Sequence, residues 1–83
     1  IIVLPYSGKE LNIVTSGKAD LEIYIDGLPI KQSIAGTDVS VDSIVQVDEP
    51  RLYNIIQTET SEEHTIQIIA NTPGFEIFTF TFG

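Results

Sequence analysis

Residues 21–30 read LEIYIDGLPI, which contains the strongest hairpin signal in the chain. Leu21, Ile23 and Ile25 alternate with Glu22, Tyr24 and Asp26, so one side of an extended chain is apolar and the other polar. The Asp-Gly pair at 26–27 then supplies residues that tolerate the positive φ angles of a two-residue hairpin turn. The stretch therefore predicts two antiparallel strands joined by a tight turn.

The same period of two recurs along the chain, as in TIQIIA and IFTFTF. We expect a polar hairpin loop at 59–63, a type II turn at Pro73–Gly74 and burial of Phe80 at the centre of the last strand. The sequence predicts an all-β domain, a small antiparallel β-sandwich of about seven or eight short strands. These strands are expected near residues 1–4, 9–15, 20–26, 28–33, 39–47, 51–57, 64–70 and 75–82.

The totals set limits on the function. The 83 residues correspond to one domain spanning 1–83, with a net charge of −8 and no cysteine. The four basic residues are scattered, which argues against nucleic acid and anionic membranes as partners. Without cysteine the chain has no thiol nucleophile and no thiolate metal site. Because position 1 is not methionine, we expect the chain to be a piece of a longer protein.

His64, the one histidine, is the first candidate for chemistry. A serine-histidine-acid set can be assembled from Ser61, His64 and Glu62, but these are neighbours on the predicted loop. Nothing in the sequence marks a nucleophile elbow or an oxyanion hole. We expect His64 to be a solvated residue at the entry of a strand, and a hydrolase is the weakest of the functions considered.

Four acids, Asp38, Asp42, Asp48 and Glu49, lie within a dozen residues and are weak candidates for a calcium site. Their spacing is not that of an EF-hand loop. The favoured interpretation is a set of solvated carboxylates, so neither a metal nor any other cofactor is expected.

The aromatic residues and the segment DEPRLYNIIQ, residues 48–57, give the ligand candidates. Tyr24 lies on the polar face of its strand and is the best placed ring for stacking on a sugar. Tyr53 shares its parity with Ile55 and is expected to pack with its hydroxyl near a backbone group. Arg51 is expected to pair with Asp48 or Glu49. Tyr24, Tyr53 and Arg51 are thus the predicted ligand-binding residues.

An ordered series of segments carries a family resemblance: LEIYIDGLPI, AGTDV, DEPRLYNII, EHTIQI and TPGFEIFTFTFG. From about residue 19 to Gly83 the chain resembles the C-terminal domain of DipZ-type thiol:disulfide interchange proteins and of related alkyl hydroperoxide reductase/thiol-specific antioxidant proteins. RLY and the terminal FTFG are the most specific parts. The resemblance implies a galactose-binding or carbohydrate-binding-module-like jelly-roll sandwich that follows a thioredoxin-like domain.

In that family the redox chemistry belongs to a Cys-x-x-Cys motif of the preceding domain, so no redox role transfers to a residue of this chain. The family domain is also usually longer at its N-terminal side. The resemblance implies a non-catalytic accessory domain, whose partner is a thioredoxin-like domain of the same chain or of another protein. It favours a place outside the cytoplasm, in the periplasm or at the cell surface. A free-standing carbohydrate-binding module is the alternative, and self-association is expected when an apolar strip loses its neighbour.

Overall fold

The computed structural model describes residues 1–15, 17–73 and 75–83. These residues form six strands, and every strand pairing is antiparallel. The predicted turn at Pro73–Gly74 includes Gly74, which lies outside the described residues. The strands are β1 (Ile2–Thr15), β2 (Ala19–Ile25), β3 (Leu28–Pro29), β4 (Ile44–Val47), β5 (Arg51–Ala70) and β6 (Ile77–Phe82).

The strands belong to one open sheet with the order β3-β2-β5-β1-β6. Strand β4 pairs with residues 19–22 of β2, beside the point where β3 pairs with residues 24–25. The all-β antiparallel prediction is confirmed. Seven or eight short strands were expected, but the described residues form six, because two pairs of predicted strands are each a single long strand.

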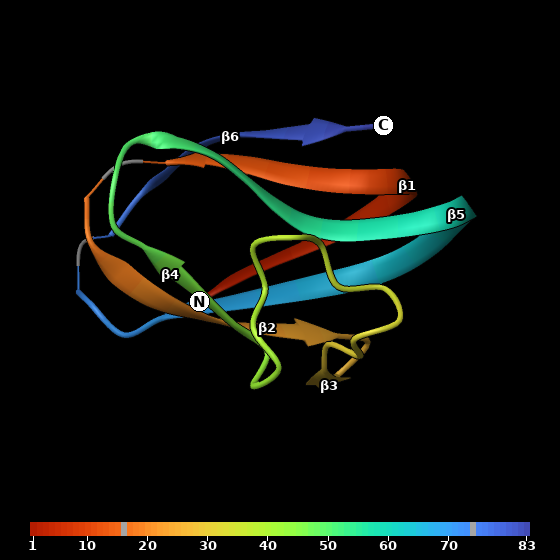
Figure 1. Ribbon diagram of the computed structural model, residues 1–83, viewed down its shortest axis with the longest axis horizontal. Coiled ribbons are helices and arrows are strands. Elements are labelled where there is room, and N and C mark those ends of the chain that lie inside the picture. Colours follow the sequence, from red (N-terminus) through yellow and green to blue (C-terminus); the bar gives the residue numbers. More distant parts are fainter. Residues whose placement is uncertain (16, 74) are drawn as a thin grey trace.

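Strands β1 and β5 are 14 and 20 residues long and pair along almost their whole length. The pairing steps from Gly8↔Glu62 to Glu10↔Gln57, so one residue of β1 lies opposite four residues of β5. Figure 1 shows both strands running out to this corner and turning back. The predicted loop at 59–63 is therefore wrong: residues 58–61 form a bulge at the corner of a continuous strand, and Glu62 and Glu63 pair with Gly8 and Ser7 of β1.

The C-terminus is tied to this corner. Lys9 donates its backbone N–H to the carbonyl of Gly83 at 2.7 Å, and Gly83 donates to the carbonyl of Glu10 at 3.0 Å. A Cβ on Gly8 would lie 2.7 Å from the Gly83 carbonyl oxygen, so only glycine lets the two backbones approach this closely. The last residue of β6 and Gly83 thus fix the end of the chain to β1 beside the bend.

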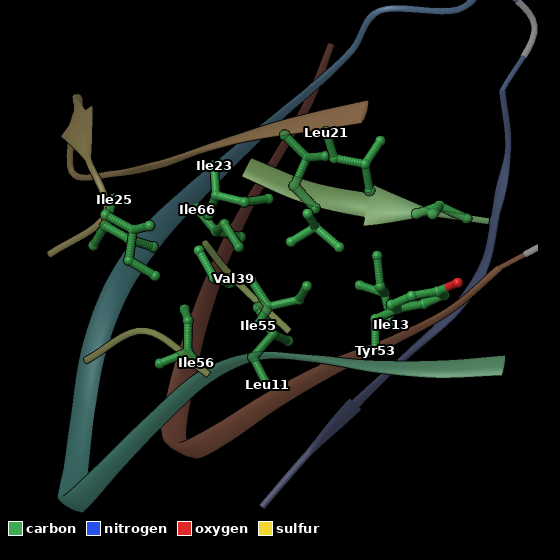
Figure 2. Packing of buried hydrophobic residues seen from close by; sticks show 14 of the residues in the cluster. Leu11, Ile13, Leu21, Ile23, Ile25, Val39, Tyr53, Ile55, Ile56 and Ile66 are labelled. Atoms are coloured by element: carbon green, nitrogen blue, oxygen red, sulfur yellow. The ribbon is translucent and has the colours of Figure 1, made fainter. Parts of the chain in front are cut away.

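The bend turns the two halves of the sheet toward each other, and the core fills the space between them. Figure 2 shows Leu21, Ile23 and Ile66 facing Leu11, Ile13 and Ile55 from the opposite half. All six are fully buried. The side chains come from strands far apart in the sequence, so the core depends on the corner being in place.

The opening stretch folds as predicted. Leu21, Ile23 and Ile25 are buried, and the residues between them are exposed or half-exposed. Asp26 and Gly27 have φ angles of 52° and 87°, both in the left-handed region that a type I′ turn needs. Ile25 pairs with Leu28 across this turn. The alternation and the Asp-Gly turn were sufficient to predict this hairpin.

The segment between β3 and β4 covers the free edge of the first half of β5. Ala35 forms an isolated bridge with Ile56, and Gly36 donates to the Ile55 carbonyl at 2.8 Å. The side chain of Asn54, only 8% exposed, accepts a hydrogen bond from the Thr37 N–H at 2.8 Å. An edge strand with unpaired backbone groups is thereby covered by the chain itself.

Strand β6 pairs only with β1, so it lies at the edge of the sheet. Phe80 lies opposite Ile13 and packs against the core, but it is half-buried. Phe78 and Phe82 are 64% and 51% exposed. The predicted burial of Phe80 at the strand centre is therefore wrong in degree, because an edge strand has a neighbour on one side only.

Two leucines of the opening hairpin give a matched test of the fold. Leu21 is fully buried and Leu28 is 63% exposed. We expect Leu21→Ala to lower the free energy of unfolding by about 2–5 kcal/mol, because it leaves a cavity in the core. Leu28→Ala should change the free energy little. Urea denaturation measures both, and equal effects would contradict the arrangement of the hairpin.

Gly36 tests the covering segment. A Cβ at this position would lie 2.4 Å from the Asn54 carbonyl oxygen, a backbone atom that cannot rotate away. We expect Gly36→Ala to cost about 1–3 kcal/mol through overpacking. Ser33→Ala, in an exposed part of the same segment, is the control. An unfolding midpoint unchanged by Gly36→Ala would mean that the segment does not lie against β5.

Candidate functional site

Tyr24 lies on the outer face of the sheet, as its parity predicted. It is half-exposed, and its cross-strand neighbours are Gln67 of β5 and Pro29 of β3. Gln67 in turn pairs with Val3 of β1, which is 61% exposed. One row of side chains thus runs across four strands on the outer face. The Tyr24 hydroxyl donates to Glu22 Oε1 at 3.3 Å, and the negative charge of Glu22 raises the pKa of Tyr24.

Tyr53 has a structural role. Its side chain is fully buried, so its ring offers no face to a sugar. The hydroxyl donates to the Glu49 carbonyl at 2.8 Å and accepts from the N–H groups of Asp48 at 3.2 Å and Glu49 at 3.3 Å. The prediction of a backbone partner for this hydroxyl is confirmed. The tyrosine fixes the turn that leads into β5.

Arg51 lies over the Tyr53 ring, with its Cζ 3.8 Å from the ring centroid, a cation–π geometry. Its Nη2 donates to Asp38 Oδ1 at 2.9 Å, and its Nε lies 3.7 Å from Glu49 Oε1. The predicted pairing with Glu49 is present at the longer distance. The closer partner, Asp38, comes from the covering segment and was not predicted. Arg51 thus connects that segment to β5.

The four acids proposed for calcium are not assembled into a metal site. Asp38 accepts from Arg51 and, at 2.7 Å, from the N–H of Asn54. Partial burial raises the pKa of Asp38, but these two hydrogen bonds outweigh it and lower the pKa overall. Within the described ranges no group of three or more histidine, aspartate or glutamate side chains has an arrangement that could hold a metal ion.

A cluster that the sequence did not reveal surrounds His64; we call Tyr6, Asp26, Glu62 and His64 the histidine cluster. His64 Nδ1 lies 2.6 Å from Asp26 Oδ2, and His64 Nε2 lies 2.7 Å from Glu62 Oε1. Tyr6 pairs with His64 across β1 and β5, and their ring centroids are 6.0 Å apart. The four residues come from β1, β5 and the β2–β3 turn.

His64 is therefore not the solvated residue that was predicted. Its side chain is 19% exposed and lies in the middle of β5. The hydrogen bonds to Asp26 and then to Glu62 raise its pKa, against a smaller opposing effect of burial. The bond to His64 and the Thr65 N–H lower the pKa of Asp26. Both pKa shifts mean that the charged forms of His64 and Asp26 are favoured. The cluster is therefore an imidazolium between two carboxylates.

The Tyr6 hydroxyl lies beside these charges. It is buried, and no group in the described part of the chain forms a hydrogen bond with it. Burial raises the pKa of the Tyr6 hydroxyl to about 12, and the charges of Glu62 and Asp26 add to the effect. The ring also stacks on Phe82, with centroids 6.4 Å apart. This hydroxyl is therefore neutral at any physiological pH.

The histidine cluster does not have the arrangement of a hydrolytic triad. A catalytic histidine accepts the proton of a nucleophile with one nitrogen while an acid orients the other. Here carboxylates occupy both nitrogens, and among the described residues no hydrogen bond joins Ser61 to His64. The spacing Glu62-x-His64 could have suggested the pair only if the strand had been known to continue through residues 59–63.

Two surface cavities adjoin the histidine cluster. The larger, about 530 Å³, is lined by Tyr6, Asp26, Glu63 and His64 among others. The second, about 320 Å³, is lined by Asp26, Glu62 and His64 together with side chains of β3 and the following segment. Asp26 and His64 line both cavities, so this ion pair borders each of them.

These features define a small all-β domain. The polar groups around Tyr53, Arg51 and His64 connect its separate segments. No described helix is long and apolar enough to cross a membrane. The chain belongs to the thioredoxin-like C-terminal domain family, whose model matches residues 1–83. The match thus covers the N-terminal strand as well as the part from residue 19 onward that carried the resemblance. No curated protein and no solved structure matched the chain.

Two tyrosines of this subsection form a matched pair of variants. We expect Tyr53→Phe to lower the free energy of unfolding by about 1–3 kcal/mol, because two N–H groups and one carbonyl lose their partner in a buried place. Tyr24→Phe removes an exposed hydroxyl and should leave stability nearly unchanged. Thermal unfolding followed by circular dichroism compares them, and a larger effect of Tyr24→Phe would contradict the assigned roles.

Proposed function

We propose that this chain is a non-catalytic accessory domain that docks on a thioredoxin-like domain through the outer face of its sheet. The observation that carries the proposal is the row of side chains centred on Tyr24. We define the Tyr24 face as Val3, Tyr24, Pro29, Gln67 and Ile69. It joins β1, β5, β2 and β3, and its members are exposed or half-exposed.

The composition of the Tyr24 face supports a protein partner. Val3, Pro29 and Ile69 are apolar, and Tyr24 combines an apolar ring with a polar tip. None of the five members carries a charge, and the exposed Glu22, which pairs with Ile69 and accepts from the Tyr24 hydroxyl, is a charged neighbour of the face. Interfaces are enriched in aromatic residues and depleted of charge at their centres. The family name points to a thioredoxin-like neighbour, and intrachain interfaces bury about 600–1,500 Å². The occupant to which this proposal commits is a thioredoxin-like domain of the same polypeptide.

The absence of cysteine supports a non-catalytic role for this domain. With no thiol in the chain, disulfide chemistry has to be performed by the neighbour, and this domain contributes recognition or positioning. The resemblance to the domains of DipZ-type thiol:disulfide interchange proteins and their galactose-binding-like relatives agrees with such a role. A position outside the cytoplasm belongs to the same proposal.

Carbohydrate binding is the second candidate, and the half-exposed ring of Tyr24 favours it. A flat ring on an open sheet face can stack on the apolar side of a pyranose. Sugar and protein would then bind to the same surface. Titrating the domain with each ligand separately shows which of the two it binds.

The experiment is chemical-shift mapping of the ¹⁵N-labelled domain with the thioredoxin-like domain of its parent protein and, separately, with neutral oligosaccharides. We expect shifts at Val3, Tyr24 and Gln67 with the protein and none with the sugars. Val3→Asp should weaken docking about ten-fold, since it places a charge in the contact. Val41→Asp is the matched control, because Val41 is 80% exposed and lies in the segment between β3 and β4.

The outcomes separate the candidates. Shifts centred on Tyr24 with oligosaccharides alone would replace docking by carbohydrate binding. Shifts with the protein on another surface, or equal weakening by Val3→Asp and Val41→Asp, would contradict the Tyr24 face as the docking site.

A further inference from the structure

The histidine cluster connects the β2–β3 turn to β5 through the side chain of Asp26. Its Oδ2 contacts His64 Nδ1 at 2.6 Å, and its Oδ1 accepts the N–H of Thr65 at 2.9 Å. The backbone N–H of Asp26 also donates to the Thr65 carbonyl at 2.9 Å. One carboxylate therefore holds the tip of a hairpin against two successive residues of a neighbouring strand.

The two contacts of His64 require two protons on its ring. A neutral imidazole has one N–H and one lone pair, whereas both nitrogens of the imidazolium donate. Because Asp26 and Glu62 are acceptors when ionised, the doubly protonated ring satisfies both at 2.6 and 2.7 Å. When a proton is lost, one carboxylate faces a lone pair at a distance that suits only a hydrogen bond.

The Asp26–His64 contact lies beside two surface cavities. Asp26 and His64 line both cavities, of about 530 and 320 Å³, and the buried Tyr6 hydroxyl belongs to the same cluster. Loss of the Asp26–His64 contact would loosen the turn where it borders these cavities. Two contacts of Asp26 do not involve His64, because its Oδ1 accepts the N–H of Thr65 and its backbone N–H donates to the Thr65 carbonyl. They would limit the motion to the hairpin tip.

We propose that the histidine cluster is a proton-controlled latch, which holds the β2–β3 turn against β5 while His64 is an imidazolium and releases the turn when His64 is neutral. The latch is independent of the docking function proposed for the Tyr24 face. It requires only that the cluster keeps its geometry in solution.

The charged groups around His64 come from every element packed against it. Asp26 belongs to the turn, Glu62 and Glu63 to β5, and Lys31 to the segment after β3, where it lines the smaller cavity. Tyr6 of β1, with a pKa of about 12, stays neutral while His64 titrates. At neutral pH the nearby acids outnumber Lys31, so the local field favours the imidazolium.

The sign of the pH dependence follows from the two shifts. The pKa of His64 is raised in the folded protein, so its contribution is complete below the pKa of the unfolded chain and is lost as pH rises through the folded value. The pKa of Asp26 is lowered, so its contribution is present above its unfolded pKa and is lost as pH falls through the folded value. The latch is therefore tightest in mildly acidic solution and opens on the alkaline side.

The test follows the hairpin by NMR between about pH 5.5 and about pH 9, where histidine is the side chain that ordinarily titrates. The amide signals of Gly27, Leu28 and Thr65 should shift with the same midpoint as the His64 ring protons. Their opening constants from hydrogen exchange, corrected for the intrinsic rate at each pH, should rise several-fold across that midpoint. Amides of the Leu21–Ile23 segment should not change.

His64→Gln and Asp26→Asn are the variants, and Asp42→Asn, an exposed acid in the segment between β3 and β4, is the matched control. Both cluster variants should abolish the pH dependence of the hairpin amides, and the control should keep it. If a variant fails to fold, the pH titration of the unaltered domain still decides. Hairpin amides that do not follow the His64 midpoint, or that follow it equally in His64→Gln, would overturn the latch.

Discussion

The pairing of β1 with β5 along both strands is the constraint on which the rest of the structure depends. Fourteen residues of one strand and twenty of the other cannot stay straight and still bury an apolar face in a domain of 83 residues. The step in register at Gly8 and Glu10 lets both strands bend together. A flat sheet of this size would leave its apolar side in water. Each leucine or isoleucine that the bent sheet buries would then lose about 1.5–3 kcal/mol of stabilisation. The bend converts one sheet into two facing surfaces.

The histidine cluster is a consequence of that bend. On the inner face of β5 the apolar residues Ile66 and Ile68 are succeeded, toward the corner, by His64 and Glu62. His64 is only 19% exposed, and a charge that is largely removed from water is costly without a partner. Asp26 of the turn supplies one, and the two acids together hold a cation between them. The core thus ends in an ion cluster, and the cluster fixes the hairpin tip.

The two sides of the sheet carry different kinds of residues. The inner side is committed to packing, and the polar residues predicted as ligand sites around Tyr53 and Arg51 serve the turn and the covering segment. The outer side carries the uncharged Tyr24 face. The chain contains no cysteine, and its family is that of a thioredoxin-like C-terminal domain.

Local patterns in the chain were enough to predict the all-β class, the alternation of Leu21 to Ile25, the turn at Asp26–Gly27, and the backbone partner of the Tyr53 hydroxyl. Each depends on residues close together in the chain, where periodicity and turn chemistry act directly.

Other features depend on how the strands are arranged in space: residues 59–63 continue a strand, Phe80 lies at an edge, Asp38 pairs with Arg51, and Asp26 and Glu62 meet at His64. Polar residues such as those at 59–63 are typical of a loop, and they remain in a strand here because β1 pairs with β5 on both sides of the corner. Asp38 is 13 residues away from Arg51 in the sequence, and Asp26 is 38 residues away from His64. Contacts at that separation depend on how the strands are ordered, which no local pattern encodes.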